Sequence, residues 1–202
     1  MAAPLLYQFS FSHFCEKARW ALDYRGRPYD YRNLVPGFHA RVTTAIAPAS
    51  HVPILVEDDA VVQGSDAIVD RVDRDVAVPL TPADPAVAGE AARWEQFAAE
   101  QIGVPLRLWF YFHRLPDADS AIAFLTQETD ERQRDALARV YPKVRAAMSI
   151  RMNINADSAA TARETLIAAL DTLDDTLADR DYLVGTAFSR ADLSVAGFEH
   201  EG

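Results

Sequence analysis

The chain has 202 residues, of which 50% are hydrophobic and 25% are charged, and its formal net charge is −10. This length can bury the core of one large domain or two small ones, and the apolar content excludes a disordered chain. No apolar run reaches the roughly 18 residues of a membrane helix, and so acidic a chain is a poor candidate for binding nucleic-acid phosphates, so we expect neither membrane nor nucleic acid among its partners.

The first residues, MAAPLLYQF, lack a basic segment followed by a long apolar stretch, so we expect no export signal. Cys15 is the only cysteine, which excludes a disulfide within the chain and fits a reducing compartment. We therefore expect a cytoplasmic protein. The five histidines and the carboxylates show no metal-ligand spacing, so we expect no metal site.

Residues 5–73 alternate between short apolar runs and helical spacing. The patterns predict strands at 5–9, 29–33, 53–57 and 60–62, and helices at 14–24, 38–47 and 65–73. The order is βαβαββα. A parallel β-α-β unit followed by a hairpin is typical of an α/β thioredoxin-like domain.

The periodicity fails where Pro79, Pro82 and Pro85 crowd together, which predicts a linker. Beyond it the spacing is helical, with predicted helices at 86–113 (bent at Pro105), 130–152 (with Pro142 as a second bend) and 159–178. We therefore expect a thioredoxin-like domain at residues 1–75, a linker at 76–85 and an all-α domain at 86–202.

The first predicted helix opens with an S-x-x-C pattern, from Ser12 to Cys15, directly after a strand. At such a place the unpaired N–H groups and the positive end of the helix dipole favour an anion. A hydroxyl there can also donate to a thiolate and hold it ionised. Ser12 as an ordinary N-cap is the alternative interpretation.

Two further turns carry candidate ligand-binding groups. Val52 and Pro53 open the third strand, where a cis peptide bond would present the Val52 backbone to a peptide-like ligand. The turn from Gln63 to Asp66 leads into the next helix, whose first N–H groups, with the Ser65 hydroxyl, suit a carboxylate. A simple N-cap role for Ser65 is the alternative.

Taken together with their spacing, these three segments resemble the cytosolic glutathione transferase superfamily, in its serine-type form. The resemblance spans nearly the whole chain. It is strengthened by the stretch Tyr182-Leu183-Val184-Gly185, followed by Ser189-Arg190-Ala191-Asp192. This stretch is similar to a structural capping box of that family, in which Ser189 would cap a helix and Asp192 would reach back to it.

The resemblance implies glutathione as co-substrate, a small hydrophobic electrophile as second substrate, and a homodimer. Ser12 would activate the glutathione thiol, Val52 would pair with the cysteinyl backbone, and Ser65 would take the γ-glutamyl carboxylate. His51 is similar to a position that touches the glycine carboxylate, with a plain surface histidine as the alternative. The implied glutathione-binding set is His51, Val52, Pro53, Gln63, Ser65 and Asp66, and the implied electrophile pocket includes Trp94, Phe97 and Tyr111.

The chain departs from the family pattern at two places. Serine-type relatives usually have Glu or Gln directly before the position of Ser65, where this chain has Gly64. Gln63 could substitute if the turn adjusts, or Asp66 could contact the ammonium group of the ligand. The sequence also ends ten residues after Asp192, so we expect a helical domain that is short at its C-terminus and a more open electrophile pocket.

Three functions stay open at this point. The first is conjugation of glutathione to an electrophile, with Ser12 as the activating residue. The second is a non-catalytic glutathione transferase-like binding or interaction protein, motivated by Gly64 and the short C-terminus. The third is a glutathione-dependent thiol reductase or peroxidase that uses Cys15. We expect Cys15 to be a packing residue, because cysteine-type relatives place their thiol at the first position of the motif.

Overall fold

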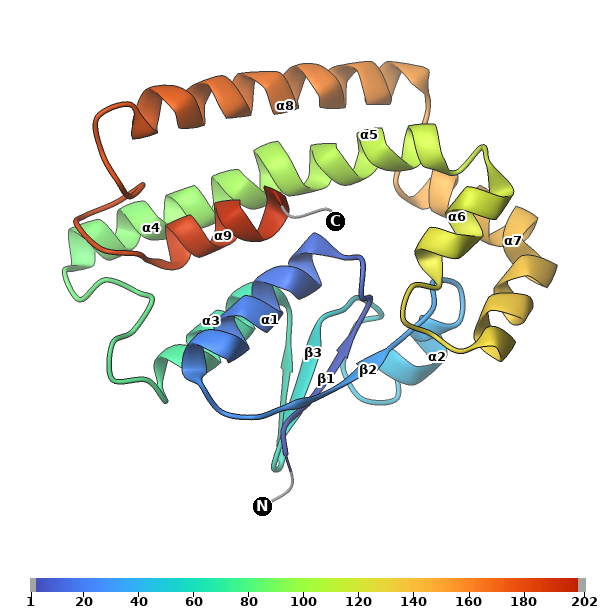
Figure 1. Ribbon diagram of the computed structural model, residues 1–202, viewed down its shortest axis with the longest axis horizontal. Helices are drawn as coiled ribbons and strands as arrows, with labels where there is room; N and C mark the ends of the chain where they lie inside the picture. The colour runs from blue at the N-terminus through green and yellow to red at the C-terminus, as the bar shows by residue number, and fades with distance from the viewer. Residues whose placement is uncertain (1–2, 200–202) are drawn as a thin grey trace.

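The computed structural model describes residues 3–199. Its first half contains, in chain order, β1 (Leu5–Gln8), α1 (His13–Arg25), β2 (Asp30–Asn33), α2 (His39–Thr43), β3 (Ile54–Glu57), β4 (Ala60–Gln63) and α3 (Ser65–Asp73). Its second half contains α4 (Pro85–Phe97), the π-helical segment η1 (Ala98–Gly103), α5 (Val104–Arg114), α6 (Ala118–Leu125), α7 (Glu131–Arg151), α8 (Ala156–Leu177) and α9 (Arg190–Glu199). A thioredoxin-like domain followed by a helical domain is therefore confirmed (Figure 1). The end of the chain, residues 200–202, lies outside the described residues.

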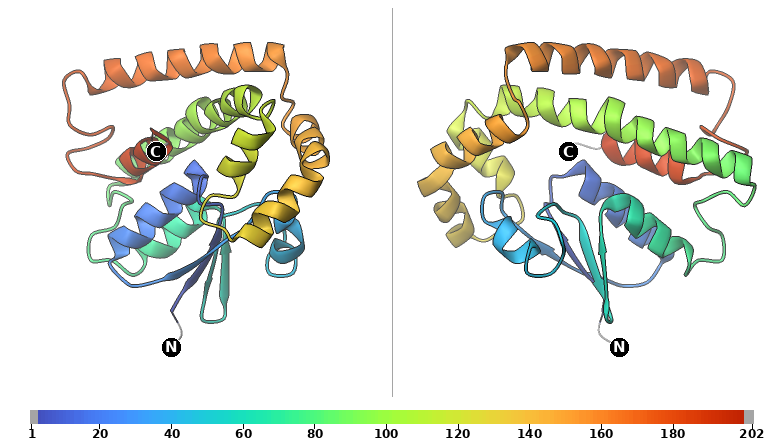
Figure 2. Two further views of the ribbon diagram at one scale, coloured as in Figure 1. Left: turned by 45° about the vertical axis from the view of Figure 1, so that its right-hand side comes forward. Right: turned by 180° about the vertical axis from the view of Figure 1, so that it is seen from behind.

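The four strands form one mixed sheet in the order β2-β1-β3-β4. β1 is parallel to β2 and antiparallel to β3, and β3 forms a hairpin with β4. Helices α1 and α3 cover one face of this sheet, and α2 lies on the opposite side (Figures 1 and 2). Leu6 and Leu55 of the sheet are fully buried against Leu22 of α1 and Ile68 of α3. This apolar contact holds α1 against the sheet and thereby positions Ser12, at the start of the helix.

Helices α4 and α5 form one long rod, interrupted by the π-helical segment η1 (Figure 1). The sequence predicts a bend at Pro105, and the structure places the irregular segment just before that residue. Pro105 has no N–H to donate to the carbonyl of Gln101, and its ring crowds that carbonyl. A wider turn directly before the proline accommodates both effects.

Several boundaries differ from those predicted. The helix expected at 38–47 ends at Thr43, and the short helix α6 was not predicted. Asp117 accepts a hydrogen bond from the Ser120 N–H and caps α6. A helix therefore begins in a segment whose sequence pattern predicts a loop. Pro142 lies within α7, which continues past it. No helix within residues 3–199 has both the length and the apolar character needed to cross a membrane.

A buried ion-pair network joins the two domains. Lys17 of α1, only 1% exposed, donates to Glu95 of α4 at 2.6 Å and also pairs with Asp66 of α3. Arg190 of α9 donates to the second carboxylate oxygen of Glu95 and to Asp70 of α3. The two domains are therefore held in one relative position, which fixes the shape of the space between them.

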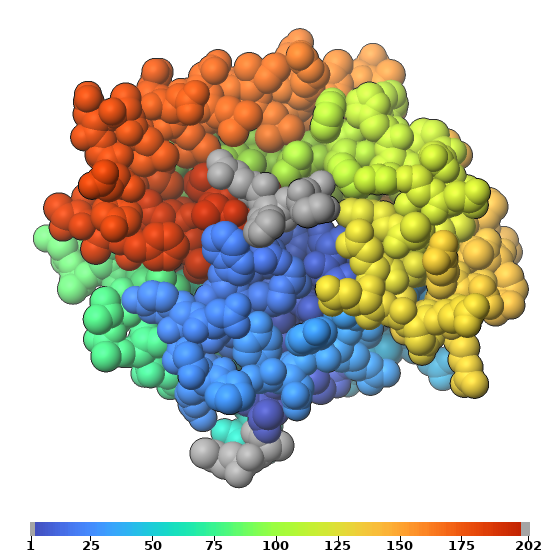
Figure 3. Space-filling view, in the orientation of Figure 1, coloured from blue at the N-terminus to red at the C-terminus, as the bar shows by residue number. Residues whose placement is uncertain are grey.

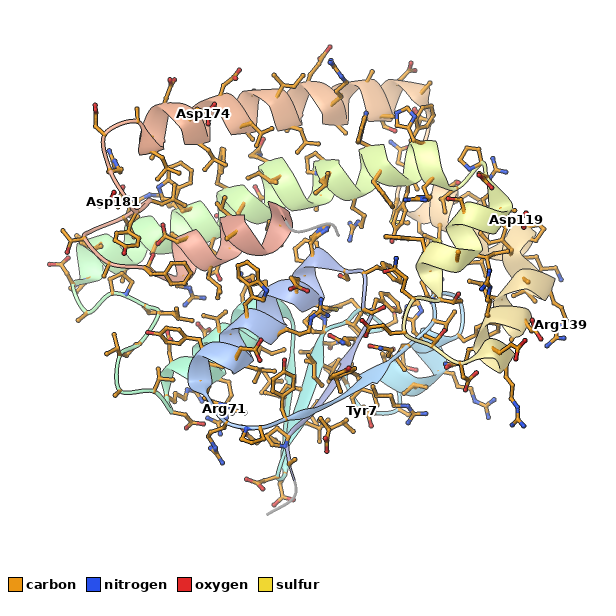
Figure 4. All side chains as sticks on the ribbon, in the orientation of Figure 1. Tyr7, Arg71, Asp119, Arg139, Asp174 and Asp181 are labelled. Atoms are coloured by element: carbon orange, nitrogen blue, oxygen red, sulfur yellow. The ribbon has the colours of Figure 1, made fainter. Side chains whose placement is uncertain are left out.

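Several charged residues away from this network lie at the periphery. Asp174 and Asp181 are exposed in and after α8, which forms the outermost layer of the helical domain (Figure 4). Asp119 of α6 and Arg139 of α7 are exposed on the outside of the opposite end of that domain (Figure 4). Much of the acidic charge of the chain therefore lies on outer surfaces.

Candidate functional site

A cavity of about 490 Å³ lies between the two domains. One wall comes from the start of α1, the loop leading into α2 and the segment before β3, and the other from α5, α6 and α7. On the surface, the N-terminal domain borders α6 and α7 on one face of the molecule (Figure 3). The lining residues are Phe9, Phe11, Ser12, His13, Phe14, Pro36, Gly37, His39, Ala40, Ser50, His51 and Val52 from the first wall, and Arg107, Phe110, Tyr111, Phe124, Lys143, Val144, Ala147, Met148, Arg151 and Met152 from the second.

Ser12 lines this cavity at the start of α1. It occupies the N-cap position with an extended backbone (φ −87°, ψ 121°), yet its side chain caps no N–H group of the helix. Its hydroxyl instead contacts the thiol of Cys15. The positive end of α1 therefore has no side-chain cap, and the Ser12 hydroxyl beside it lines the cavity. Together, these two groups suit an anionic sulfur.

Cys15 is completely buried beneath Ser12. Burial raises the pKa of its thiol to about 11, although contacts with the Phe9 backbone, Ser12 and Arg19 act in the opposite direction. Such a thiol is protonated at neutral pH. Since the thiolate is the reactive form, Cys15 is a poor nucleophile in this setting.

The segment before β3 brings His51 and Val52 to the cavity. The Val52–Pro53 peptide bond is cis. The amide of Gln63 holds this segment in place, because its Nε2 donates to the carbonyls of Ala49 and His51, both at 2.8 Å. Gln63 itself does not line the cavity, and its side chain is committed to these backbone contacts.

Ser65 and Asp66 also lie outside the cavity lining. Ser65 is the first residue of α3 and is buried, while the N-cap position belongs to Gly64, whose φ of 100° favours glycine. Asp66 is exposed but paired with Lys17. The structure thus places both residues at the start of α3.

The aromatic residues expected around an electrophile separate into two places. Tyr111 lines the cavity. Trp94 and Phe97 pack against each other, with ring centroids 5.1 Å apart, and against the core between α4, α8 and α9. They do not line the cavity.

Sequence reasoning did not find the charged residues of the cavity. Arg107 of α5 and two residues of α7, Lys143 and Arg151, line it, as do His13 and His39. The only sequence signal was Arg107 as a lone cation in the aromatic run from Leu106 to Phe112. The residues at 107, 110 and 111 share one helical face, which is the face that α5 turns to the cavity.

Burial lowers the pKa of two histidines of the cavity, His13 and His39. The pKa of His13 is lowered to about 4, first by burial and then by the charge of Arg107. The pKa of His39 is also lowered, by burial and by Arg151. The buried Nε2 atom of His13 makes no hydrogen bond with the described residues. Among residues 3–199, no group of three or more His, Cys, Asp or Glu is placed to hold a metal ion.

The stretch around Ser189 lies away from the cavity and supports the core. The Ser189 N–H and hydroxyl both donate to Asp192 at 2.9 Å, and the Leu183 N–H donates to the other oxygen of Asp192 at 2.8 Å. These bonds fix the start of α9 and the turn before it. Helix α9 packs directly against α1, which carries Ser12.

Two family models match the chain. The N-terminal domain of glutathione S-transferase matches residues 6–79, and the C-terminal domain of glutathione S-transferase matches residues 123–198. Together the two matches extend over more than two thirds of the chain. A search of curated proteins gave no match.

Solved structures with the same fold include the β-etherase LigF from Sphingobium sp. strain SYK-6, with 20% identity and a TM-score of 0.72. A glutathione S-transferase from Methylobacterium radiotolerans, in complex with glutathione sulfonate, has 21% identity and a TM-score of 0.69. A theta class glutathione S-transferase from Xanthomonas axonopodis pv. citri, with glutathione bound, has 22% identity and a TM-score of 0.67. The matches cover 98%, 98% and 96% of this chain and 82%, 78% and 80% of those chains, respectively.

Proposed function

Because the chain belongs to the glutathione S-transferase family, we propose that it binds glutathione in the cavity between its domains and transfers it to an electrophile bound beside it. The observation that carries the proposal is Ser12, which lines the cavity from the N-cap position of α1 while its hydroxyl caps no helix N–H. A plain capping role therefore does not account for this side chain.

Glutathione would lie along the wall that the thioredoxin-like domain contributes. Its thiol would meet Ser12, and its cysteinyl backbone would pair with Val52, which lines the same wall. His51, exposed at the cavity, would face the glycine carboxylate. Ser65 and the first N–H groups of α3 would take the γ-glutamyl carboxylate beyond the cavity. Asp66, although paired with Lys17, is exposed enough to meet the ammonium group.

The chemistry needs a thiolate and a positioned electrophile. The Ser12 hydroxyl and the positive end of α1 would stabilise the thiolate of glutathione, and each unit of pKa lowering corresponds to about 1.4 kcal/mol. The thiol proton leaves to solvent. The sulfur then forms a bond to the electrophilic carbon, and the leaving group departs with the electron pair of its bond to that carbon.

One pair of variants tests the proposal. We expect the protein to be retained on immobilised glutathione and to conjugate a neutral chlorodinitrobenzene. Ser12→Ala should lower kcat/KM about 100-fold, which is typical for loss of one donor to a developing anion. Cys15→Ala, the matched control one helical turn away, should change it no more than a few-fold. Loss of activity in Cys15→Ala alone, or no retention on glutathione, would contradict the proposal.

A second candidate is a glutathione-binding protein without transferase activity. Gly64 favours it, because this position offers no side chain to the γ-glutamyl end of glutathione and the space around it is open. Retention on glutathione without conjugation of any electrophile would support this candidate. The buried, protonated Cys15 argues against the thiol reductase or peroxidase alternative.

The family resemblance also leads us to propose a homodimer. Light scattering in solution should give twice the mass of the 22.4 kDa chain. A monomer mass at micromolar concentration would contradict this part of the proposal without touching the assignment of Ser12.

A further inference from the structure

The charge that lines the cavity is opposite in sign to the charge of the whole chain. Three cations line the cavity, namely Arg107, Lys143 and Arg151, and the described lining residues include no Asp or Glu. The chain as a whole carries a formal net charge of −10. A concave site with one sign of charge and apolar walls concentrates ligands of the opposite sign.

Arg107 is the most buried of the three cations that line the cavity. It is half-buried on α5, and its guanidinium lies 5.8 Å from the centre of the Phe14 ring. None of the ion pairs among residues 3–199 involves Arg107, whereas Lys17 and Arg190, the buried cations of the domain interface, each pair with two carboxylates. Burial lowers the pKa of Arg107; the nearby Tyr111 acts in the opposite direction, and no carboxylate does so. A desolvated charge of this kind gains from an anionic ligand.

The wall around Arg107 is apolar. Phe110 of α5 and Phe124 of α6 line it with ring centroids 4.8 Å apart, and Val144 and Met148 of α7 continue the same surface. These side chains would accommodate the aromatic or aliphatic body of a ligand. The site thus combines an apolar surface with one partly buried positive charge.

The contacts that we assign to glutathione leave these cations unused. The groups that we assign to glutathione, Ser12, His51 and Val52, belong to the thioredoxin-like domain. All three cations belong to the helical domain, on α5 and α7. The positive charge therefore lies on the wall that faces glutathione, where the second substrate would bind.

We propose that the second substrate is an amphipathic organic anion, an electrophile whose apolar body contacts Phe110, Phe124 and Met148 and whose carboxylate or sulfonate binds Arg107. This inference rests on the proposed function, since it names the substrate class of the same site. Lys143 and Arg151 are exposed at the cavity, so they attract the anion and contribute less to its affinity.

Two electrophiles with the same leaving group test the inference. We would measure kcat/KM for a chloronitrobenzoate and for the neutral chloronitrobenzamide, each divided by the rate of that compound with free glutathione. The natural protein should favour the benzoate. Arg107→Met should lower the benzoate value about 10- to 100-fold, as expected for loss of a hydrogen bond to a charged group, and leave the amide value nearly unchanged.

Two further variants serve as controls. Arg107→Lys keeps the charge and should retain most of the preference for the benzoate. Arg93→Met removes an exposed arginine of α4 that does not line the cavity, so it changes the net charge equally and should alter neither value. An equal loss for both electrophiles in Arg107→Met would overturn the inference. So would a raised thiol pKa of bound glutathione in that variant, because it would place Arg107 at the sulfur.

Binding of an unreactive nitrobenzoate, measured by calorimetry without glutathione, separates this inference from the proposed function. If neither electrophile is conjugated but nitrobenzoate binds and Arg107→Met abolishes the binding, the proposed function fails and the anion site stands. If the amide is conjugated and nitrobenzoate does not bind, the anion site is refuted and the proposed function stands.

Discussion

The Nζ atom of Lys17 lies 2.6 Å from a carboxylate oxygen of Glu95, in a buried ion pair between the first helix of the thioredoxin-like domain and the first helix of the helical domain. The exposed fraction is 1% for Lys17 and 7% for Glu95. A buried pair of this kind contributes specificity more than stability, but removing one partner leaves an uncompensated charge.

We therefore expect Lys17→Met to destabilise the protein by about 3 kcal/mol, the lower end of the range for a broken buried pair, because Arg190 still pairs with Glu95. Urea unfolding measures this difference. The matched control is Lys143→Met, because Lys143 is the other lysine of the chain and is exposed. This variant should lower the free energy of unfolding by less than about 0.5 kcal/mol. Equal losses in the two variants would show that the pair does not hold the domains.

Cys15 should be unreactive in the folded protein. It is fully buried and its pKa is raised to about 11, so the thiolate is scarce at neutral pH. A disulfide reagent should label it only after denaturant is added. Because the folded pKa lies above the ordinary value of 9.0, this thiol favours folding below pH 9 and loses that effect as the pH rises toward 11. Rapid labelling of the native protein at neutral pH would contradict the burial of Cys15.

Mild acidification should destabilise the protein through His13. The pKa of His13 in the folded state is about 4, below the ordinary value of 6.5, so the folded state binds fewer protons than the unfolded state. The stability that this group contributes above pH 6.5 is therefore lost as the pH falls toward 4. The difference corresponds to about 3 kcal/mol. Unfolding free energies across this window should fall less steeply in His13→Gln. An unchanged slope would mean that His13 titrates alike in both states.

Gly37 and Gly26 offer a matched pair of substitutions. Both have positive φ, 89° and 69°, but a Cβ at Gly37 would lie 2.7 Å from Cγ2 of Val144, whereas a Cβ at Gly26 would meet nothing within 4 Å. Gly26→Ala should cost about 1 to 2 kcal/mol from backbone strain alone. Gly37→Ala should cost about 1 to 3 kcal/mol more, because valine in a helix is held in one rotamer.

The double variant Gly37→Ala/Val144→Ala checks the cause of that extra loss. It should recover part of the difference between the two glycine variants in a thermal unfolding experiment. Equal stabilities of Gly37→Ala and Gly26→Ala would show that the loop before α2 does not close tightly against α7.

The sequence pattern predicted the features that local residues determine. The start of α1, the hairpin of β3 and β4 and the start of α3 are set by neighbouring residues and by turn chemistry, and all three agree with the structure. The short helix α6 escaped prediction because its 8 residues are fewer than the window of roughly 11 to 18 residues in which helical periodicity can be recognised.

The electrophile side of the site could not be predicted, because it depends on packing between distant segments. The sequence predicted a helix over 86–113 with a bend at Pro105, but not the π-helical turn before that residue, which adds a residue and rotates the following helix by about 100°. Tyr111 therefore lines the cavity while Trp94 and Phe97 pack in the core. Arg107 meets Phe14 only because α5 crosses the start of α1, and no spacing in the sequence reports that contact.

The role of Ser12 is tested most directly by the thiol pKa of bound glutathione, read from thiolate absorbance across a pH titration of the complex. In the natural protein this pKa should lie well below that of free glutathione, and Ser12→Ala should raise it by at least one unit while glutathione affinity changes little. Cys15→Ala should leave it within a few tenths of a unit. The same thiol pKa in the natural protein and in Ser12→Ala would contradict the account.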